Sequence, residues 1–252
     1  PATSALYFRG PTLDRFDGRQ WRPAPPLLEV SPTYTLIGAP VRYQITIEPQ
    51  SLNVLPMLDG TGQVQAVAGQ PLPRLQRHGA QWYAGNVSKR RLQLEGLMWP
   101  RAFEGPTEET LWLRNWVALP PGFNPRTLAW AAQLRQRPDL ATADAAQLAQ
   151  AVLAHIRRGQ FRYTLSPGLP DNPEERHLID DFWLDRQAGY CEHFASAFVV
   201  IMRAMDVPAR VVTGYQGAEL NPVDDQYIVR NSNAHAWAEI WQAGKGWVRV
   251  DP

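Results

Sequence analysis

The sequence predicts an α+β protein in which a mostly β region, residues 1–122, precedes a region of helices and strands, residues 123–252. Two observations support this division. Short segments with a strand-type pattern, separated by glycine and proline, fill the first region, whereas helix signals first appear at Asn124. The length of 252 residues is sufficient for two domains of roughly 100–150 residues each, so we expect a domain boundary near residue 122.

The clearest strand of the N-terminal region covers residues 41–48, where apolar and polar side chains alternate at every position. This period of two is typical of a strand with one buried face. Weaker strand patterns occur at residues 34–37, 63–67, 81–84, 91–94 and 111–117. Because glycines and prolines separate these segments, they predict a small β-sandwich or an open barrel.

Two helices are predicted at the start of the second region. Asn124 is expected to cap the first, with Pro125 in its first turn, and the apolar pattern continues over residues 128–137. Thr142 is expected to cap the second helix and Gly159 to end it. The apolar stripe of that helix consists of Leu148, Val152, Leu153 and Ile156. A strand within residues 161–165 and a short helix over residues 175–185 are expected next.

A further helix is predicted to begin around Cys191, because apolar side chains recur behind it at helical spacing. They are Phe194, Phe198, Ile201, Met202 and Met205, at i, i+4, i+7, i+8 and i+11. Cys191 therefore falls in the first turn of a buried helix. Strands are expected afterwards at residues 209–215, 226–230, 234–242 and 247–251, and residues 243–246 are expected to join the last two as a hairpin.

Composition excludes several classes of protein. The 25 Lys+Arg and 24 Asp+Glu leave a net charge of +1, which argues against a dedicated nucleic-acid binder. A hydrophobic content of 44% with ten tryptophans excludes intrinsic disorder as the main state. One cysteine excludes a disulfide within the chain and any Cys-rich metal site. The longest apolar stretch, residues 194–202, is too short to cross a bilayer, which needs about 20 residues.

The position of Cys191 favours thiol chemistry, because the free N–H groups and the dipole at a helix N-terminus stabilise a thiolate. A thiol nucleophile also needs a base, and His235 opens the predicted strand 234–242. In the predicted hairpin, Asp251 approaches His235 if the strand faces that carry them are matched. A carboxylate in that place would hold the imidazole in the orientation of a catalytic base.

Each of these three residues also has a purely structural interpretation. Free cysteines are commonly inert core residues, a histidine at the start of a strand can be a surface residue, and an aspartate before proline is common in turns. The residues taken one at a time leave these interpretations open. The order Cys, His, Asp on a helix, a strand and a second strand is that of a thiol hydrolase.

Four segments in this part of the chain carry a family resemblance. They are Gly-Tyr-Cys-Glu-His-Phe-Ala-Ser-Ala-Phe at 189–198, Val-Pro-Ala-Arg-Val-Val-Thr-Gly-Tyr at 207–215, His-Ala-Trp at 235–237 and Gly-Trp-Val-Arg-Val-Asp-Pro at 246–252. In this order they resemble the nucleophile, strand, histidine and aspartate motifs of the transglutaminase-like superfamily. The resemblance implies a papain-like core over residues 123–252, in which a helix that carries the cysteine packs against an antiparallel sheet.

The same resemblance implies roles for the site residues. Cys191 would be the nucleophile, His235 the base and acid, and Asp251 the carboxylate that orients the histidine. The implied reaction forms a thioester with a glutamine carboxamide and passes the acyl group to a primary amine or to water. The backbone N–H of Cys191 is one candidate oxyanion donor. Trp183 is a second, because animal transglutaminases use a tryptophan indole, although a core tryptophan is the simpler interpretation here.

Residues 7–10 and 14–21 resemble bacterial inner-membrane proteins of the TgpA type, which have an extracytoplasmic transglutaminase domain. We therefore expect a periplasmic domain cut from a longer protein, with membrane contact only through segments outside this chain. The expected partners are a protein or peptide substrate with a glutamine side chain and an amine acceptor, without nucleic acid, metal or cofactor. Two other functions stay open, namely a cysteine peptidase or amidase of the cell envelope and a non-catalytic envelope binding module.

Overall fold

The computed structural model describes residues 3–24, 33–71, 73–85, 90–168 and 176–252, and its described chain divides into two compact units. Unit 1 comprises residues 1–12, 25–106 and 213–235, and unit 2 comprises residues 13–24, 107–212 and 236–252. The predicted division at residue 122 is a single cut, whereas the chain passes between these units several times. The reason is that strands far apart in the sequence pair with each other, which no local pattern records.

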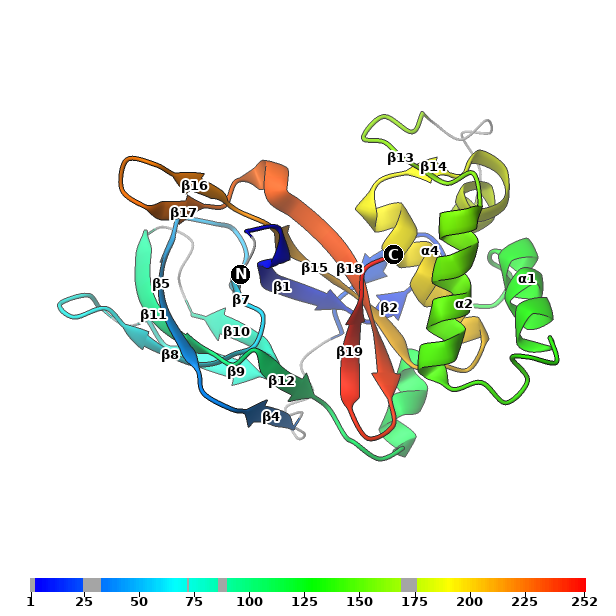
Figure 1. Ribbon diagram of the computed structural model, residues 1–252, viewed down its shortest axis with the longest axis horizontal. Helices are drawn as coiled ribbons and strands as arrows, with labels where there is room; N and C mark the ends of the chain where they lie inside the picture. The colour runs from blue at the N-terminus through cyan, green and yellow to red at the C-terminus, as the bar shows by residue number, and fades with distance from the viewer. Residues whose placement is uncertain (1–2, 25–32, 72, 86–89, 169–175) are drawn as a thin grey trace. The chain divides into compact units, whose positions relative to one another are not determined.

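Unit 1 is built almost entirely from short antiparallel strands (Figure 1). Its sheets have the strand orders β5-β11-β8 and β6-β10-β9, and β1 pairs with β7, β4 with β12, and β16 with β17. The strands are β1 (Tyr7–Leu13), β4 (Tyr34–Ile37), β5 (Val41–Ile47), β6 (Val54–Leu55), β7 (Met57–Leu58), β8 (Thr61–Ala66), β9 (Leu75–His78), β10 (Gln81–Ala84), β11 (Leu92–Met98), β12 (Arg101–Glu104), β16 (Glu219–Asn221) and β17 (Gln226–Ile228). The predicted strand at 41–48 is confirmed as β5.

The alternation in β5 explains the core of unit 1. Ile47 is buried with Leu92 and Leu94 of β11, and Tyr43 and Ile45 pack against the same cluster. The cluster also contains Leu55, Met57 and Ala84. The hydroxyl of Tyr43 accepts the N–H of Leu58 at 3.2 Å and bonds to the Thr61 hydroxyl at 2.7 Å, so this half-buried phenol is satisfied inside the sheet.

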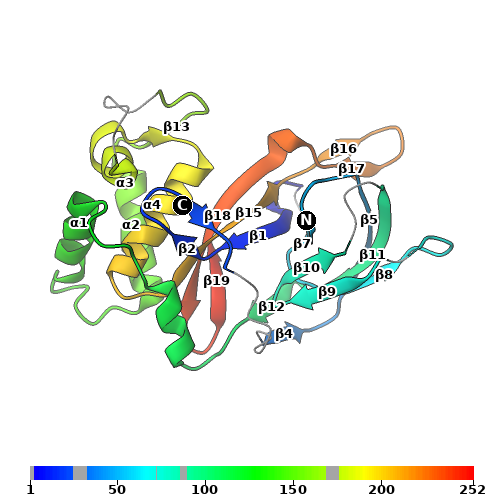
Figure 2. The same ribbon diagram turned by 180° about the vertical axis from the view of Figure 1, so that it is seen from behind.

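Helices dominate unit 2, and they lie together on one side of the hairpin of β18 and β19 (Figure 2). They are α1 (Pro125–Arg135), α2 (Ala145–Arg158), α3 (Leu178–Asp180), which continues as a π-helical turn over Asp181–Arg186, and α4 (Cys191–Ala204). The strands are β2 (Arg15–Phe16), β3 (Trp21–Arg22), β13 (Arg162–Tyr163), β14 (Ala188–Gly189), β18 (Ala234–Gln242) and β19 (Gly246–Val250). β15 (Ala209–Gln216) starts in unit 2 and ends in unit 1, and β18 crosses from unit 1 to unit 2 after His235. In the described part of the chain no helix has the length and apolar character needed to span a membrane.

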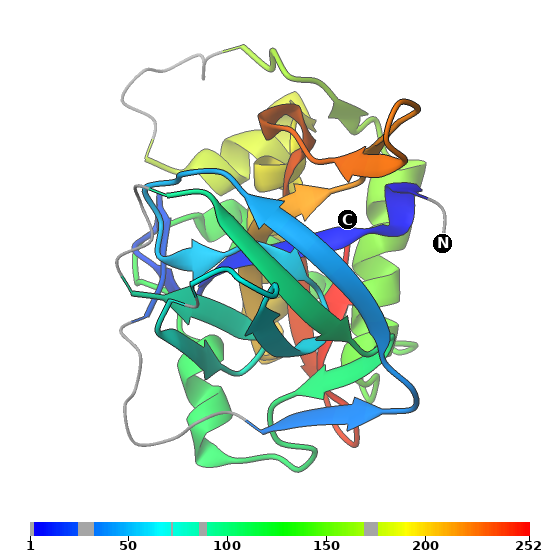
Figure 3. The ribbon, with the colours of Figure 1, turned by 90° about the vertical axis from the view of Figure 1, so that its left-hand side faces the viewer.

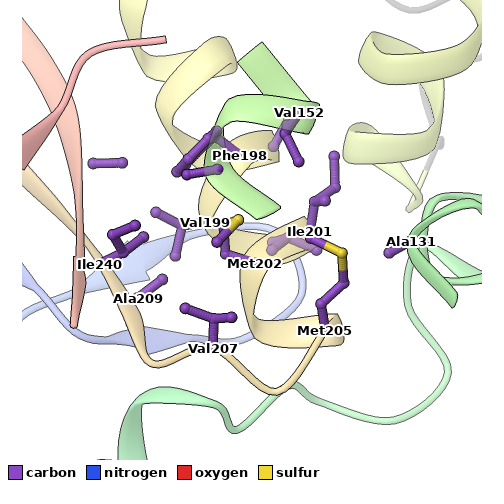
Figure 4. Close-up of a cluster of buried hydrophobic side chains, with 14 of the residues drawn as sticks. Ala131, Val152, Phe198, Val199, Ile201, Met202, Met205, Val207, Ala209 and Ile240 are labelled. Carbon is purple, nitrogen blue, oxygen red and sulfur yellow. The ribbon is translucent and has the colours of Figure 1, made fainter. Parts of the chain in front are cut away.

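The predicted apolar helix is the centre of the core of unit 2. Phe198, Ile201 and Met202 of α4 are fully buried, and Figure 4 shows them between α2 and the start of β15. Val152 of α2 and Ile240 of β18 complete this part of the cluster. Burial of such side chains contributes about 1.5–3 kcal/mol each, so this packing fixes α4 firmly in place.

A buried ion pair joins β15 to β18 within unit 2. The guanidinium of Arg210 donates to Glu239 at 2.7 and 2.8 Å, and both side chains are almost fully buried. Trp247 of β19 lies 4.2 Å from the Arg210 guanidinium carbon, so its ring covers the cation. Pairing of Ala238 with Val250 and of Trp241 with Trp247 sets the β18–β19 register and confirms the predicted hairpin.

Three local predictions are corrected by the structure. Residues 111–117, expected as a strand, contain a 3₁₀-helix over Leu111–Trp116 whose side chain Leu113 packs on Trp241 and Trp247. The cap of α2 is Asp144, not Thr142, because the Asp144 carboxylate accepts the Gln147 N–H at 2.8 Å. The short helix predicted at 175–185 spans residues 178–186, and residue 175 lies outside the described residues.

Helix α1 starts where predicted, although Asn124 does not cap it. Asn124 has a left-handed backbone, and its side chain instead accepts the N–H of Ile179 at 3.1 Å. The backbone N–H groups of Arg126 and Thr127, in the first turn of α1, donate to the buried carboxylate of Asp180 at 3.1 and 2.7 Å. A cap supplied from another helix cannot be recognised from a local pattern.

Candidate functional site

Cys191 is the first residue of helix α4, as predicted, and is partly exposed. The preceding residue, Tyr190, is extended, and its N–H donates to Nδ1 of His193 at 3.3 Å. Gly189 is required before this turn, because a Cβ at that position would lie 2.8 Å from the His193 side chain. The local sequence therefore turns the chain sharply into α4 and sets the thiol at the N-terminus of a well-packed helix.

Tyr163 lies against this helix start through the short parallel pair of β13 and β14. Tyr163 is paired with Gly189, and the neighbouring Thr164 N–H donates to the Gly189 carbonyl at 2.8 Å. Its ring stacks on Phe194 of α4, with ring centroids 6.4 Å apart and an interplanar angle of 21°. The phenol is thus fixed from both sides, although 60% of the residue surface remains exposed.

The hydroxyl of Tyr163 interacts with Cys191. Partial burial raises the pKa of Tyr163, and the nearby charges of Cys191 and then Asp251 raise it further. Hydrogen bonding to the Cys191 backbone lowers the pKa of Tyr163, and hydrogen bonding to the thiol side chain raises it. The phenol of Tyr163 therefore stays protonated at neutral pH. Cys191 and Asp251 both lie close enough to Tyr163 for their charges to affect its pKa.

Asp251 directly follows β19, whose last residue Val250 pairs with Ala238 of β18. Continued by one residue, this antiparallel register sets Asp251 opposite Trp237. His235 is the second residue of β18, within the part of that strand that belongs to unit 1, and its ring centroid lies 6.2 Å from that of Tyr7. Cys191 and Asp251 belong to unit 2.

Trp183 is fully buried, with 0% of its surface exposed. Its ring packs within an aromatic cluster, with ring centroids 5.1 Å from Trp130, 5.2 Å from His155 and 4.9 Å from Phe161. The indole N–H has no hydrogen-bond partner among the described residues. This environment favours the core interpretation that the sequence left open, and a role in oxyanion binding stays a prediction.

His193 is a further histidine in the first turn of α4. Burial lowers its pKa, and the charge of Arg186 lowers it further. Its Nδ1 is used as the acceptor for Tyr190, and its ring contacts Tyr190 and Phe182 at 4.4 and 5.6 Å. A neutral, engaged imidazole is a structural element of the helix start. Among the described residues, no three His, Cys, Asp or Glu side chains are grouped to hold a metal ion.

Sequence reasoning did not single out Tyr163 as a site residue. The region was predicted as a strand, which β13 confirms over two residues, but a tyrosine in a short strand gives no signal of its own. The contact arises from the parallel pairing of β13 with β14, whose partners lie 26 residues apart. Such pairings cannot be read from local periodicity.

Two family models match this chain. The model described as the transglutaminase-like superfamily matches residues 129–252, and the TgpA N-terminal domain matches residues 1–93. Together they cover both of the regions that differ in sequence pattern.

Similar proteins extend this match over the full length. The crystal structure of the periplasmic domain of TgpA from Pseudomonas aeruginosa is 34% identical, with a TM-score of 0.85, and the match covers 100% of this chain and 83% of that one. A second structure of that domain, bound to ethylmercury, has 35% identity and a TM-score of 0.86, with 100% and 85% covered.

Curated relatives are longer than this chain. A protein-glutamine gamma-glutamyltransferase from Pseudomonas aeruginosa is 37% identical over 257 aligned residues, which cover 100% of this chain and 36% of the relative. The uncharacterized protein YebA from Bacillus subtilis is 31% identical over 151 residues, with 58% of this chain and 20% of YebA covered. The chain thus spans about a third of the first and a fifth of the second.

Proposed function

Because this chain belongs to the transglutaminase-like superfamily, we propose that it catalyses acyl transfer from a glutamine carboxamide through a thioester on Cys191. The acceptor is a primary amine, with water as the competing acceptor. The observation that carries the proposal is the arrangement at the start of α4, where the partly exposed thiol is hydrogen-bonded to the Tyr163 hydroxyl. A thiol kept for packing alone would not require a polar partner at the surface.

Cys191 is the proposed nucleophile. At the first position of a 14-residue helix, the free N–H groups and the helix dipole favour the thiolate over the thiol. The Tyr163 hydroxyl, which keeps its own proton, donates a further hydrogen bond to the sulfur. Both effects increase the fraction of reactive thiolate at neutral pH.

His235 and Asp251 are proposed as the base and its orienting carboxylate. Side chains two residues apart on a strand share a face, so His235 points to the same face of β18 as Trp237. The register that sets Asp251 opposite Trp237 gives Asp251 that face as well. This supports a carboxylate beside the imidazole, where it would fix the tautomer and stabilise the imidazolium.

In the first half-reaction, the Cys191 thiolate adds to the glutamine carboxamide carbon. The carbon–nitrogen bond then breaks while the His235 imidazolium gives its proton to the leaving nitrogen, so ammonia departs and the thioester remains. In the second half-reaction, an amine adds to the thioester carbon and gives a proton to His235. The carbon–sulfur bond breaks, and the thiolate is restored.

The backbone N–H of Cys191 is the proposed oxyanion donor. In the free protein this N–H is occupied by the hydroxyl oxygen of Tyr163. A substrate carbonyl that takes this position must displace the tyrosine hydroxyl. The exchange replaces one hydrogen bond with another, so its net cost is small.

The name of the Pseudomonas aeruginosa relative, protein-glutamine gamma-glutamyltransferase, supports a protein substrate. The match to the periplasmic domain of TgpA supports an extracytoplasmic location for this domain.

Incorporation of a fluorescent primary amine into a glutamine-rich protein tests the proposal. We expect incorporation by the native chain, none above background by Cys191→Ala, and a decrease in kcat on the order of 10³-fold for Asp251→Asn, which leaves the histidine without its orienting charge. Trp130→Phe is the matched control, because it alters a partly buried aromatic residue of the same core that has no part in these steps. Amide hydrolysis without amine incorporation would replace the transferase with the amidase alternative. Loss of neither activity in Cys191→Ala would contradict thiol catalysis altogether.

A further inference from the structure

A groove of about 610 Å³ is lined entirely by residues of unit 1. One wall is formed by eight consecutive residues, 43–50, and the opposite wall by residues of β17 and its flanks, which include Asp225, Tyr227 and Asn231. β5 contributes residues 43–47 of this wall, and consecutive residues from both faces of a strand line one groove where it runs along the strand edge. The groove therefore reaches the edge of β5, the light-blue strand that crosses the front of the view in Figure 3.

The edge of β5 that faces away from β11 carries backbone hydrogen-bonding groups without a strand partner among the described residues. β5 is the outer strand in the order β5-β11-β8. Val67 N–H donates to the Gln93 carbonyl, so the polar backbone groups of Gln93 point toward β8 and away from its β5 partner, Thr46. In an antiparallel pair this leaves the N–H and C=O of Thr46 directed outward, and those of Gln44 two residues earlier likewise. Both residues line the groove.

Such an edge is a template for one more strand. Residues 43–50 would span roughly 20–25 Å when extended, enough for about six residues of a bound peptide. Tyr215 and Tyr227 also line the groove and offer apolar contact to alternate side chains of such a peptide. The groove thus fits an extended polypeptide better than a compact small molecule.

The charged residues that line the groove determine which peptides it can bind. Glu48 and Asp225 line the groove, and its described lining includes no lysine or arginine. Glu48 is paired with Arg91 at 2.8 Å, whereas Asp225 lies on the exposed β16–β17 turn. The local field therefore favours neutral or positively charged segments and disfavours acidic ones.

A residue next to the groove lining lies against His235 inside unit 1. Leu6 lines the groove, and the ring of the next residue, Tyr7, lies against His235. The Tyr7 hydroxyl accepts the side-chain amide of Gln216, which follows the groove residue Tyr215. A peptide seated along β5 would thus lie in the same unit as the proposed catalytic base.

We propose that the β5 edge binds an extended, lysine-bearing segment of the acyl-acceptor protein by adding it as a further strand. This inference rests on the proposed function for the identity of the segment as an acceptor. Strand addition gives affinity through the backbone and tolerates different side chains, whereas the acidic lining provides the preference for lysine. The groove then serves as an acceptor subsite built from unit 1.

The test measures binding of a fluorescent peptide of alternating threonine and valine with lysines at both ends. Fluorescence anisotropy is recorded with the Cys191→Ala protein, so that the result does not depend on turnover. Thr46→Pro removes the outward N–H of β5, and proline is tolerated at strand edges. Ala66→Pro is the matched control, because the same register directs Ala66 outward on the opposite edge of the sheet, outside the groove.

We expect Thr46→Pro to weaken peptide binding at least tenfold and Ala66→Pro to leave it within twofold of the parent protein. The same peptide N-methylated on alternate residues should bind at least tenfold more weakly, a readout that needs no protein variant to fold. A peptide with glutamates in place of the lysines should bind more weakly at low salt. Equal binding of the methylated and unmethylated peptides would overturn the proposal. Because every measurement is made without the thiol, a failed transferase assay leaves this result intact.

Discussion

Removal of one hydroxyl group from Tyr163 should slow the chemical modification of Cys191. Tyr163→Phe deletes the hydrogen bond to the sulfur but keeps the ring, whose stacking on Phe194 needs no hydroxyl. Hydrogen bonds to charged groups contribute about 1.5–3 kcal/mol, and the 60% exposure of Tyr163 reduces this through screening to about 1 kcal/mol. We therefore expect alkylation by iodoacetamide at pH 7 to be about fivefold slower.

The full pH profile separates charge from access. At alkaline pH, where the thiol is fully ionised, the rate reports only how well the reagent reaches the sulfur, and Tyr163→Phe should match or exceed the native rate. At neutral pH the variant should fall below it. The alkylation rate of Tyr163→Phe relative to the native protein is therefore expected to be lower at neutral pH but equal or higher at alkaline pH. A general loosening of the structure would raise the rate at both.

Tyr190→Phe provides the matched control for this experiment. It removes a hydroxyl beside the same helix start. Burial, and then the charges of Glu192 and Cys191, raise the pKa of the Tyr190 phenol, and hydrogen bonding to the thiol does not contribute to that shift. Its alkylation profile should overlay the native one. Identical profiles for the native protein and Tyr163→Phe would refute the reasoning that the hydroxyl stabilises the thiolate.

Other predictions concern stability and are tested by urea unfolding. Asp180→Ala should cost about 1–2 kcal/mol, because it removes the cap of α1, and an unchanged midpoint would contradict that role. Glu239→Gln leaves the buried Arg210 without its charge partner and should cost about 3–5 kcal/mol, whereas a loss below 1 kcal/mol would mean that the site admits water. Burial raises the pKa of Tyr43 from its usual 10 to about 12, so the stability it contributes is complete below pH 10 and is lost as the pH rises through 12, at most about 2–3 kcal/mol. Tyr43→Phe should flatten this alkaline loss, and an identical pH dependence in both proteins would exclude Tyr43 as its source.

Much of the fold could be predicted from periodicity. The alternation at 41–48 and the helical spacing from Phe194 to Met205 correspond to β5 and α4, because each pattern reflects burial of one face against a core. The strand prediction at 111–117 was wrong, although its apolar pattern also reflects burial of one face. Its apolar residues contact Trp241 and Trp247 as a 3₁₀-helix, and a six-residue apolar segment has too few positions to distinguish the two periods.

Contacts between residues far apart in the chain could not be predicted from the sequence. The cap of α1 joins Asp180 to residues 54 and 53 positions earlier in the chain. The contact of Tyr163 with Cys191 joins residues 28 positions apart. No local pattern encodes either contact. The position of Cys191 at a helix start could be predicted, since a glycine-containing turn and an apolar stripe surround it. How the remaining site residues meet it depends on strand order, which the order of motifs along the chain does not determine.

Formation of the thioester is the most direct test of the central claim. The chain is mixed with a glutamine peptide without an amine acceptor, quenched in acid after a fraction of a turnover time, and analysed by intact-protein and peptide mass spectrometry. The account predicts a covalent adduct equal to the peptide mass less one ammonia, located on Cys191 and released by added amine. Turnover of the peptide without an adduct on Cys191, or with an adduct on another residue, would contradict it.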